Sequence, residues 1–192
     1  MSAALIRKLS QDQEHVQAGD ANGARALCQE MLARAPRNPD ALCLLGITHL
    51  MNGHARDAIL PLEQALSVRP RHGTTLENLG LARLMLGEFA RAEHALNSAA
   101  AIPGAPASVF MRLGVAMLNQ GRHAEAVRAL ERALAINPDD PEIHLNLGQA
   151  SIHEKGAAAA RGHFESALRL NPDYADAMFN IGVICLEEQQ LD

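Results

Sequence analysis

The chain has 192 residues, a formal net charge of -5 and only 3% aromatic residues. So few aromatic residues argue against a β-sandwich, whereas abundant Ala and Leu suit closely packed helices, because both have high helix propensity. The charge is modest, and no Lys/Arg block is longer than the pair Arg7-Lys8. This excludes the basic footprint of a nucleic-acid-binding protein.

The cysteines and the lengths of the apolar segments indicate the cellular compartment of the protein. Cys28, Cys43 and Cys185 lie far apart, are odd in number and form no CxxC pair, which favours a reducing compartment with the thiols used as small buried hydrophobes. The N-terminal residues contain no apolar run typical of a signal peptide, and no stretch approaches the length of a membrane span. We therefore predict a cytoplasmic protein without membrane association.

A Leu-Gly pair, first seen at residues 45–46, recurs with a period of 34 residues (79 − 45 = 34). Its later copies are Leu79-Gly80, Leu113-Gly114, Leu147-Gly148 and Ile181-Gly182. Three further series keep the same period, with one glycine and one proline displaced by a single residue: Ala24, Ala58, Ala92, Ala126 and Ala160; Gly19, Gly53, Gly87, Gly121 and Gly156; Pro36, Pro70, Pro103, Pro138 and Pro172. Independent series with one period indicate an array of repeated supersecondary units.

Each series has a physical role in a helical hairpin. Gly53 and its equivalents stand where a first helix stops and reverses, which suits a residue that accepts positive φ. The prolines end the second helix and prepare the next start. Gly46 and its equivalents lie inside a helix, where Gly costs about 1 kcal/mol relative to Ala, so they indicate a close approach of two helices. We expect Ala58 and its equivalents to be the opposing small residues.

In chain order, the first repeat, 5–38, is the divergent one, because Gln11-Asp12 replace the Leu-Gly pair. A polar first helix suits an N-capping repeat that meets water on one side. Regular repeats are predicted over 39–72, 73–106, 107–140 and 141–174, followed by the first helix of a sixth repeat over 175–192. That last helix is apolar on too many sides for a cap. We therefore expect the chain to be the N-terminal piece of something longer, with self-association through residues 175–188 as an alternative.

These series resemble the tetratricopeptide repeat (TPR) family over nearly the whole chain. In the fourth repeat the resemblance is carried by Phe110, Leu113, Gly114, Gly121, Ala126, Leu130, Ala133 and Pro138. It implies an all-α fold in which residues 1–192 form a single right-handed superhelical solenoid of antiparallel helix-turn-helix units. It also implies that first helices line a concave groove, and that the protein is an interaction scaffold binding an extended peptide or helix there. The alternative is an N-terminal module that recruits substrates for a larger glycosyltransferase or sulfotransferase.

Residues preceding the Leu-Gly pair are the first candidates for this groove, because the pair itself faces the partner helix. They are Leu44, Asn78, Arg112, Asn146 and Asn180. The asparagines are similar to the asparagine ladder of O-linked N-acetylglucosamine transferases, in which amides bind a peptide backbone through their donor and acceptor groups. Leu44 and Arg112 interrupt the ladder here. The other interpretation is that each Asn satisfies its own helix.

Apolar and acidic side chains are predicted on the same side. Packing between adjacent first helices explains most of the apolar residues on this side. Met51, Met85 and Met111 are the ones expected to reach the groove surface, where methionine adapts to varied partners. Glu77 would lie at the rim, either as a solvated helix residue or as a contact for a basic partner. The basic clamp by which some members of the family bind acidic chaperone tails is not present, since its lysine position reads Cys43, Glu77, Met111, Leu145 and Phe179.

The sequence contains no recognisable catalytic or metal-binding motif. The sequence has nine histidines, but His49 and His54 are five apart across a predicted turn and His144 and His153 are nine apart on one helix. Neither spacing is the i, i+4 arrangement that places two imidazoles on one helical face. No GxSxG, phosphate-binding glycine loop or Cys-His signature occurs. We predict no metal, no cofactor and no enzymatic activity.

Overall fold

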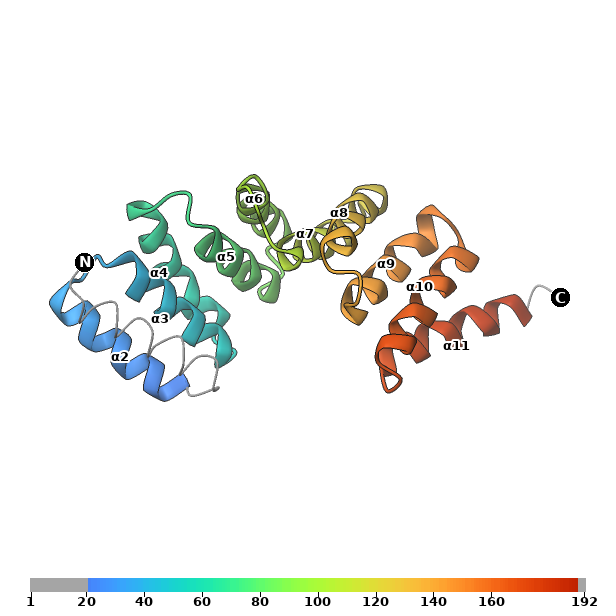
Figure 1. Ribbon diagram of the computed structural model, residues 1–192, viewed down its shortest axis with the longest axis horizontal. Coiled ribbons are helices and arrows are strands. Elements are labelled where there is room, and N and C mark those ends of the chain that lie inside the picture. Colours follow the sequence, from blue (N-terminus) through green and yellow to red (C-terminus); the bar gives the residue numbers. More distant parts are fainter. Residues whose placement is uncertain (1–20, 190–192) are drawn as a thin grey trace. The chain divides into compact units, whose positions relative to one another are not determined.

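The computed structural model describes residues 21–189, and every regular element in that range is a helix (Figure 1). The chain divides into two compact units, Met1–Pro103 and Gly104–Asp192. The helices of the first unit are α2 (Ala21–Arg34), α3 (Pro39–Met51), α4 (Ala55–Val68), α5 (Gly73–Met85) and α6 (Phe89–Ala100). Those of the second unit are α7 (Ala107–Leu118), α8 (His123–Ile136), α9 (Pro141–Glu154), α10 (Ala157–Leu170) and α11 (Ala175–Gln189).

Helices are arranged as a row of hairpins within each unit. Every helix packs against the next one in its unit, from α2 to α6 and from α7 to α11. In addition, α3 contacts α5 and α7 contacts α9, whereas no comparable contact joins α4 to α6 or α8 to α10 in the described part of the chain. In these two pairs the first helices of successive hairpins are therefore closer together than the second helices, so α3 with α5, and α7 with α9, form the inner layer of their units.

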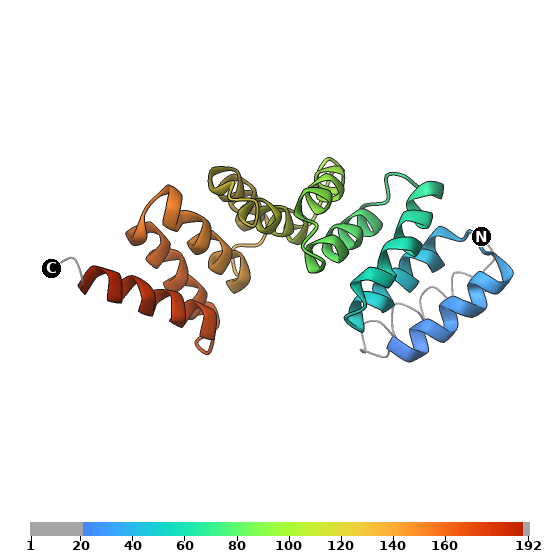
Figure 2. The ribbon, with the colours of Figure 1, turned by 180° about the vertical axis from the view of Figure 1, so that it is seen from behind.

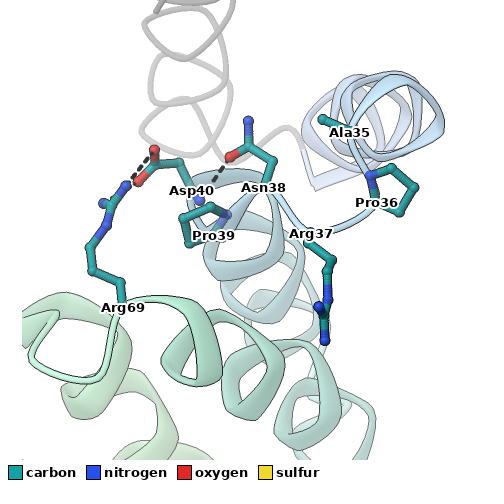
Figure 3. Close-up of a pocket in the computed structure, with 7 residues that line it drawn as sticks. All are labelled: Ala35, Pro36, Arg37, Asn38, Pro39, Asp40 and Arg69. Carbon is teal, nitrogen blue, oxygen red and sulfur yellow. Dashed lines mark hydrogen bonds and ion pairs between the residues drawn. The ribbon is translucent and has the colours of Figure 1, made fainter.

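Two of the first helices, α3 and α9, start with a capping asparagine or aspartate followed by proline. The Asn38 Oδ1 accepts a hydrogen bond from the backbone N–H of Asp40 at 3.0 Å (Figure 3). It accepts another from the backbone N–H of Ala41 at 3.2 Å, and Pro39 is the first residue of α3. Asp140 caps α9 in the same way, with Pro141 following it. Such a cap satisfies backbone donors that the helix itself leaves unpaired, and it contributes about 1 kcal/mol.

Glycines end the first helices, as the sequence predicts. Gly53, Gly87 and Gly121 have φ of 74°, 71° and 72°, and the displaced Gly156 has 85°. In the first of these turns, the backbone N–H of Gly53 donates to the carbonyl of Leu50, and the N–H one residue later donates to the carbonyl of His49, both at 2.9 Å. This pair of bonds is the Schellman motif. The predicted positive φ is confirmed.

The close approach at the Leu-Gly glycines is also confirmed, but its partner differs from the prediction. A Cβ added to Gly46 would lie 2.5 Å from the Cγ of Leu62, and a Cβ at Gly80 would lie 2.5 Å from the Cγ of Leu96. The same clash occurs between Gly114 and Leu130 and between Gly148 and Phe164. Glycine is needed because a large side chain of the second helix fills its space.

Ala58, which the sequence analysis placed opposite Gly46, lies one turn before Leu62 and is fully buried in the same core cluster. The prediction that a small residue lies opposite Gly46 was therefore wrong, because the nearest side chain is that of Leu62. The alanine series still has a structural role, because Ala92, Ala126 and Ala160 are equally buried. Small residues on this face allow the second helix to pack closely, while the leucine or phenylalanine a turn later occupies the space that glycine leaves.

The two ends of the array differ in what the structure describes. The Gln11-Asp12 helix predicted to cap the first repeat lies outside the described residues. At the other end, α11 packs on α10, and the views from both sides show no further described helix covering it (Figures 1 and 2). A Cβ added to Gly182 accordingly meets no atom within 4 Å. Among the described helices, none combines the length and apolarity that crossing a membrane requires.

Candidate binding surface

A cavity of about 300 Å³ lies in the second unit, between the first helices α7 and α9 and the start of α8. It is lined by Val115, Leu118, Asn119, His123, Asn146, Gln149 and His153. Asn146, Gln149 and His153 share one face of α9, because they are spaced i, i+3, i+7. The cavity therefore belongs to the inner layer of helices, where the sequence analysis placed a groove.

Amides in this cavity are held in place by their own helices. The Asn119 Nδ2 donates to the carbonyl of Val115 at 2.9 Å, and the Asn146 Nδ2 donates to the carbonyl of Glu142, also at 2.9 Å. A carboxamide has two N–H donors and an oxygen with two lone pairs, so one such bond uses only a part of its capacity. The bond fixes the orientation of the amide and leaves acceptor capacity for a ligand.

Two imidazoles complete the polar lining. The rings of His123 and His153 have centroids 4.4 Å apart and planes inclined at 39°. The His123 Nδ1 is buried and makes no hydrogen bond. A buried ring nitrogen without a partner costs free energy, whereas the rest of the half-buried His123 ring is partly exposed and lines the cavity.

The predicted ladder and groove residues of the second unit differ in how deeply they are buried. The Asn180 Nδ2 donates to the carbonyl of Asp176 at 2.7 Å, and the residue is half-buried. Arg112 is also half-buried. Met111 is only 9% exposed, so the expectation that it reaches the surface was wrong. Its position faces the packing between helices, which was the alternative interpretation.

In the first unit, Met51 and Met85 are 39% and 50% exposed, as expected for surface residues. Glu77 is half-buried. The Asn78 Nδ2 donates to the carbonyl of Thr74 at 2.8 Å. All three asparagines of the ladder thus bond to the carbonyl four residues earlier, which is the local role that the sequence left open.

Sequence reasoning missed four polar residues of the cavity: Asn119, His123, Gln149 and His153. Two of them were within reach, because Gln149 and His153 follow from extending the helical face that contains Asn146. The other two lie at the end of α7 and the start of α8. Their positions depend on the turn between the helices, which no helical periodicity predicts.

A second cavity, of about 640 Å³, lies in the first unit where α2 leads into α3 (Figure 3). Its one acidic residue is already paired, since Asp40 accepts bonds from Arg69 Nη1 at 2.7 Å and Nη2 at 3.2 Å. The hydrogen bond to Asp40 raises the pKa of Arg69. This fork-like pair ties the end of α4 to the start of α3, which is a structural role.

Histidines also gather elsewhere. In the first unit, His49, His54 and Asp57 each place one potential metal-ligand atom within 4.8 Å of the other two. Among the described residues, this is the one group of three such side chains. In the second unit the rings of His144 and His163 have centroids 5.8 Å apart. Burial, aided by the charge of His144, lowers the pKa of His163.

Comparison with known sequences matches three models to this chain. The TPR repeat model matches residues 107–151, one tetratricopeptide repeat model matches 15–60, and a second matches 43–108 and 153–192. The last alone covers more than half of the chain. No curated protein was matched by sequence.

Solved structures show the same fold. A crystal structure of MamA is 26% identical, with a TM-score of 0.73, covering 85% of this chain and 96% of that one. The thermophilic TPR protein TTC0263 of Thermus thermophilus is 21% identical (TM-score 0.71, 94% and 98% covered), and Pseudomonas aeruginosa pilF is 19% identical (0.76, 96% and 90%). With hairpins at a 34-residue period, glycines packed against large side chains, and these matches, the chain belongs to the tetratricopeptide repeat family.

Proposed function

We propose that this chain is an interaction scaffold whose second unit binds an extended peptide along the inner layer formed by α7 and α9. The family as a whole consists of protein-interaction modules. The observation that supports a peptide site here is the cavity between α7 and α9, with its oriented asparagine amides and its pair of histidine rings. The three free cysteines are in keeping with a cytoplasmic setting, and we assign the chain no catalytic step.

Recognition would rest on the peptide backbone. Asn119 and Asn146 already donate to their own helices, so their carboxamide oxygens are the groups available to accept peptide N–H bonds. Each such bond contributes about 0.5–1.5 kcal/mol net, so one bond alone gives little affinity. Val115 and Leu118 line the same cavity and would supply apolar contact for a side chain of the ligand.

Charge favours a partner with basic residues around apolar ones. The chain has a net charge of -5, and the acidic Glu142 and Asp176 are exposed near the starts of α9 and α11. In the first unit, Met51 and Met85 offer exposed, adaptable apolar surface, and the half-buried Glu77 adds a further acidic group on α5. Opposite charges of this kind raise association rates more than they raise final affinity.

Selection from a display library of random peptides provides the test, followed by calorimetric measurement of the selected peptide. Asn146→Ala should weaken binding about 2- to 12-fold, the equivalent of one lost hydrogen bond, and Asn119→Ala should add to the loss. Asn97→Ala is the matched control, because Asn97 is exposed on the second helix α6. Equal affinity of the Asn119/Asn146 double variant, or an equal loss in the control, would contradict the assignment.

We also propose that two copies associate through α11. Met178, Phe179 and Leu186 are 48%, 72% and 61% exposed, on a first helix that no described second helix covers. Phe179→Asp should abolish any concentration-dependent increase of mass in sedimentation. Leu170→Asp, at a 40% exposed residue of α10, should leave it unchanged. A mass equal to one chain at all concentrations would refute this association.

A further inference from the structure

The turn between α3 and α4 gathers three side chains that commonly ligate metals. His49 comes from the last turn of α3, His54 is the residue before α4, and Asp57 lies in the first turn of α4. A nitrogen of each histidine and a carboxylate oxygen all lie within 4.8 Å of one another. His54 and Asp57 are exposed and His49 is half-buried, so an ion from solution can reach all three.

Two rules of backbone geometry explain why residues five and eight apart meet here. The bonds from Gly53 N–H to Leu50 O and from His54 N–H to His49 O form a Schellman motif. This motif brings the side chains of its first and last residues together, in most proteins as an apolar contact, and here those residues are both histidines. Asp57 is the third residue of α4, and that position reaches back to the residue before the helix, as in a capping box.

Two other hairpins show what this turn holds when both positions carry charged side chains. The residue before α6 and the third residue of that helix are Glu88 and Arg91, which form an ion pair at 3.3 Å. At the start of α8 the same positions are Arg122 and Glu125, with Nε donating to Oε1 at 2.7 Å. The turn therefore places these two side chains against each other in each case. In the α3–α4 hairpin it does so with an imidazole and a carboxylate, and it adds a second imidazole from α3.

We propose that His49, His54 and Asp57 bind a divalent transition-metal ion of the zinc class. Two imidazole nitrogens and one carboxylate oxygen suit such an ion, whereas Mg²⁺ and Ca²⁺ take oxygen ligands. In a tetrahedral Zn²⁺ site with bonds of about 2.0–2.2 Å, ligand atoms lie about 3.4 Å apart. The present separations, within 4.8 Å, exceed that value, so binding requires the exposed side chains of His54 and Asp57 to move toward the ion. Water occupies the fourth position.

The site is independent of the peptide cavity, since it lies in the other compact unit and uses none of the same residues. It is also separable from folding. His54 makes no side-chain bond that caps α4, so His54→Ala removes a ligand without removing a cap. Asp57→Asn keeps the size of the side chain and replaces the charged ligand by a neutral one.

Calorimetric titration of tag-free protein with Zn²⁺ tests the proposal, together with visible spectra of the Co²⁺ form. The wild type should bind one ion at this site, and His54→Ala and Asp57→Asn should each weaken that binding about tenfold or more. His123→Ala is the matched control, because it removes one ring of the imidazole pair in the second unit and should leave the affinity unchanged. Circular dichroism of each variant should report unchanged helicity.

Site-specific assignment comes from NMR of the imidazole nitrogens, in which His49 and His54 should shift on addition of Zn²⁺. Unchanged affinity in both His54→Ala and Asp57→Asn would overturn the proposal. So would loss of binding in His123→Ala with these two unaffected. A thiolate-to-metal charge-transfer band in the Co²⁺ spectrum would likewise overturn it, by assigning the ion to a cysteine.

Discussion

Replacing Gly80 with alanine tests the contact on which every hairpin depends. Gly80 lies inside α5, and an added Cβ would sit 2.5 Å from the Cγ and 2.7 Å from the Cδ2 of Leu96 on α6. Real Cβ atoms do not approach carbon so closely. Because the nearest atom is the branching carbon of Leu96 and the residue is fully buried, rotation of a side-chain tip cannot remove the clash. The two helices must move apart.

Two opposing effects set the magnitude. Alanine is favoured over glycine in a helix by about 1 kcal/mol, and overpacking of a filled core costs about 1–3 kcal/mol. The clash is severe, so we take the upper half of that range, which leaves a net destabilisation of about 1–2 kcal/mol. For a chain of this size each kcal/mol lowers the melting temperature by about 2–4 °C.

Thermal and urea unfolding followed by circular dichroism measure the effect, and Gly182→Ala is the matched control. Gly182 has the same position in its repeat, but an added Cβ meets nothing within 4 Å, so only the helix-propensity gain of up to about 1 kcal/mol should remain. Leu96→Ala alone should cost about 2–5 kcal/mol. In the Gly80→Ala background it should cost less, because the added methyl group then has room. Equal stabilisation by Gly80→Ala and Gly182→Ala would refute the reasoning.

Three further predictions concern single groups. Burial lowers the pKa of His163, so below its ordinary pKa of about 6.5 the unfolded chain binds more protons than the folded chain, and the folded state loses stability as the pH falls. In urea titrations between about pH 7.5 and pH 5.5, His163→Gln should reduce this loss of stability. Burial raises the pKa of Cys43, so alkylation followed by mass spectrometry should label the half-exposed Cys185 first and Cys43 only on unfolding. Asn38→Ala removes the acceptor for two backbone N–H groups and should cost about 1 kcal/mol, and an unchanged melting temperature would contradict that role.

The sequence predicts the hairpins well because their constraints are local and recur. A glycine that needs positive φ, as at Gly53, and a glycine inside a helix, as at Gly46, each leave a mark at a fixed position of the period. The opposing residue is harder to predict. Ala58 and Leu62 are one turn apart on the same face of α4, so periodicity places both toward α3 and cannot tell which of them meets the glycine.

Side-chain direction explains the weaker agreement at the candidate binding surface. Position in the repeat placed Asn146 at the inner layer, where it does line a cavity, but it could not show that the amide donates to Glu142 of its own helix. Met111 and Met85 were treated alike, although one is 9% and the other 50% exposed. Their burial depends on how neighbouring helices pack, and that depends on residues outside the repeated pattern.

The turn at His49 and His54 shows where a helical spacing rule fails in principle. The i, i+4 rule assumes that the helix continues between two ligands, whereas here α3 ends at Met51 and the chain reverses through Gly53. In a Schellman motif the side chains that meet come from residues five apart, as His49 and His54 are. These turn positions are half-buried or exposed and lie outside the core, so repeats can vary them without loss of the hairpin. In two other hairpins these positions form ion pairs, which involve Glu88 and Arg122. We infer that in the α3–α4 turn the same positions carry imidazoles instead and bind a metal ion.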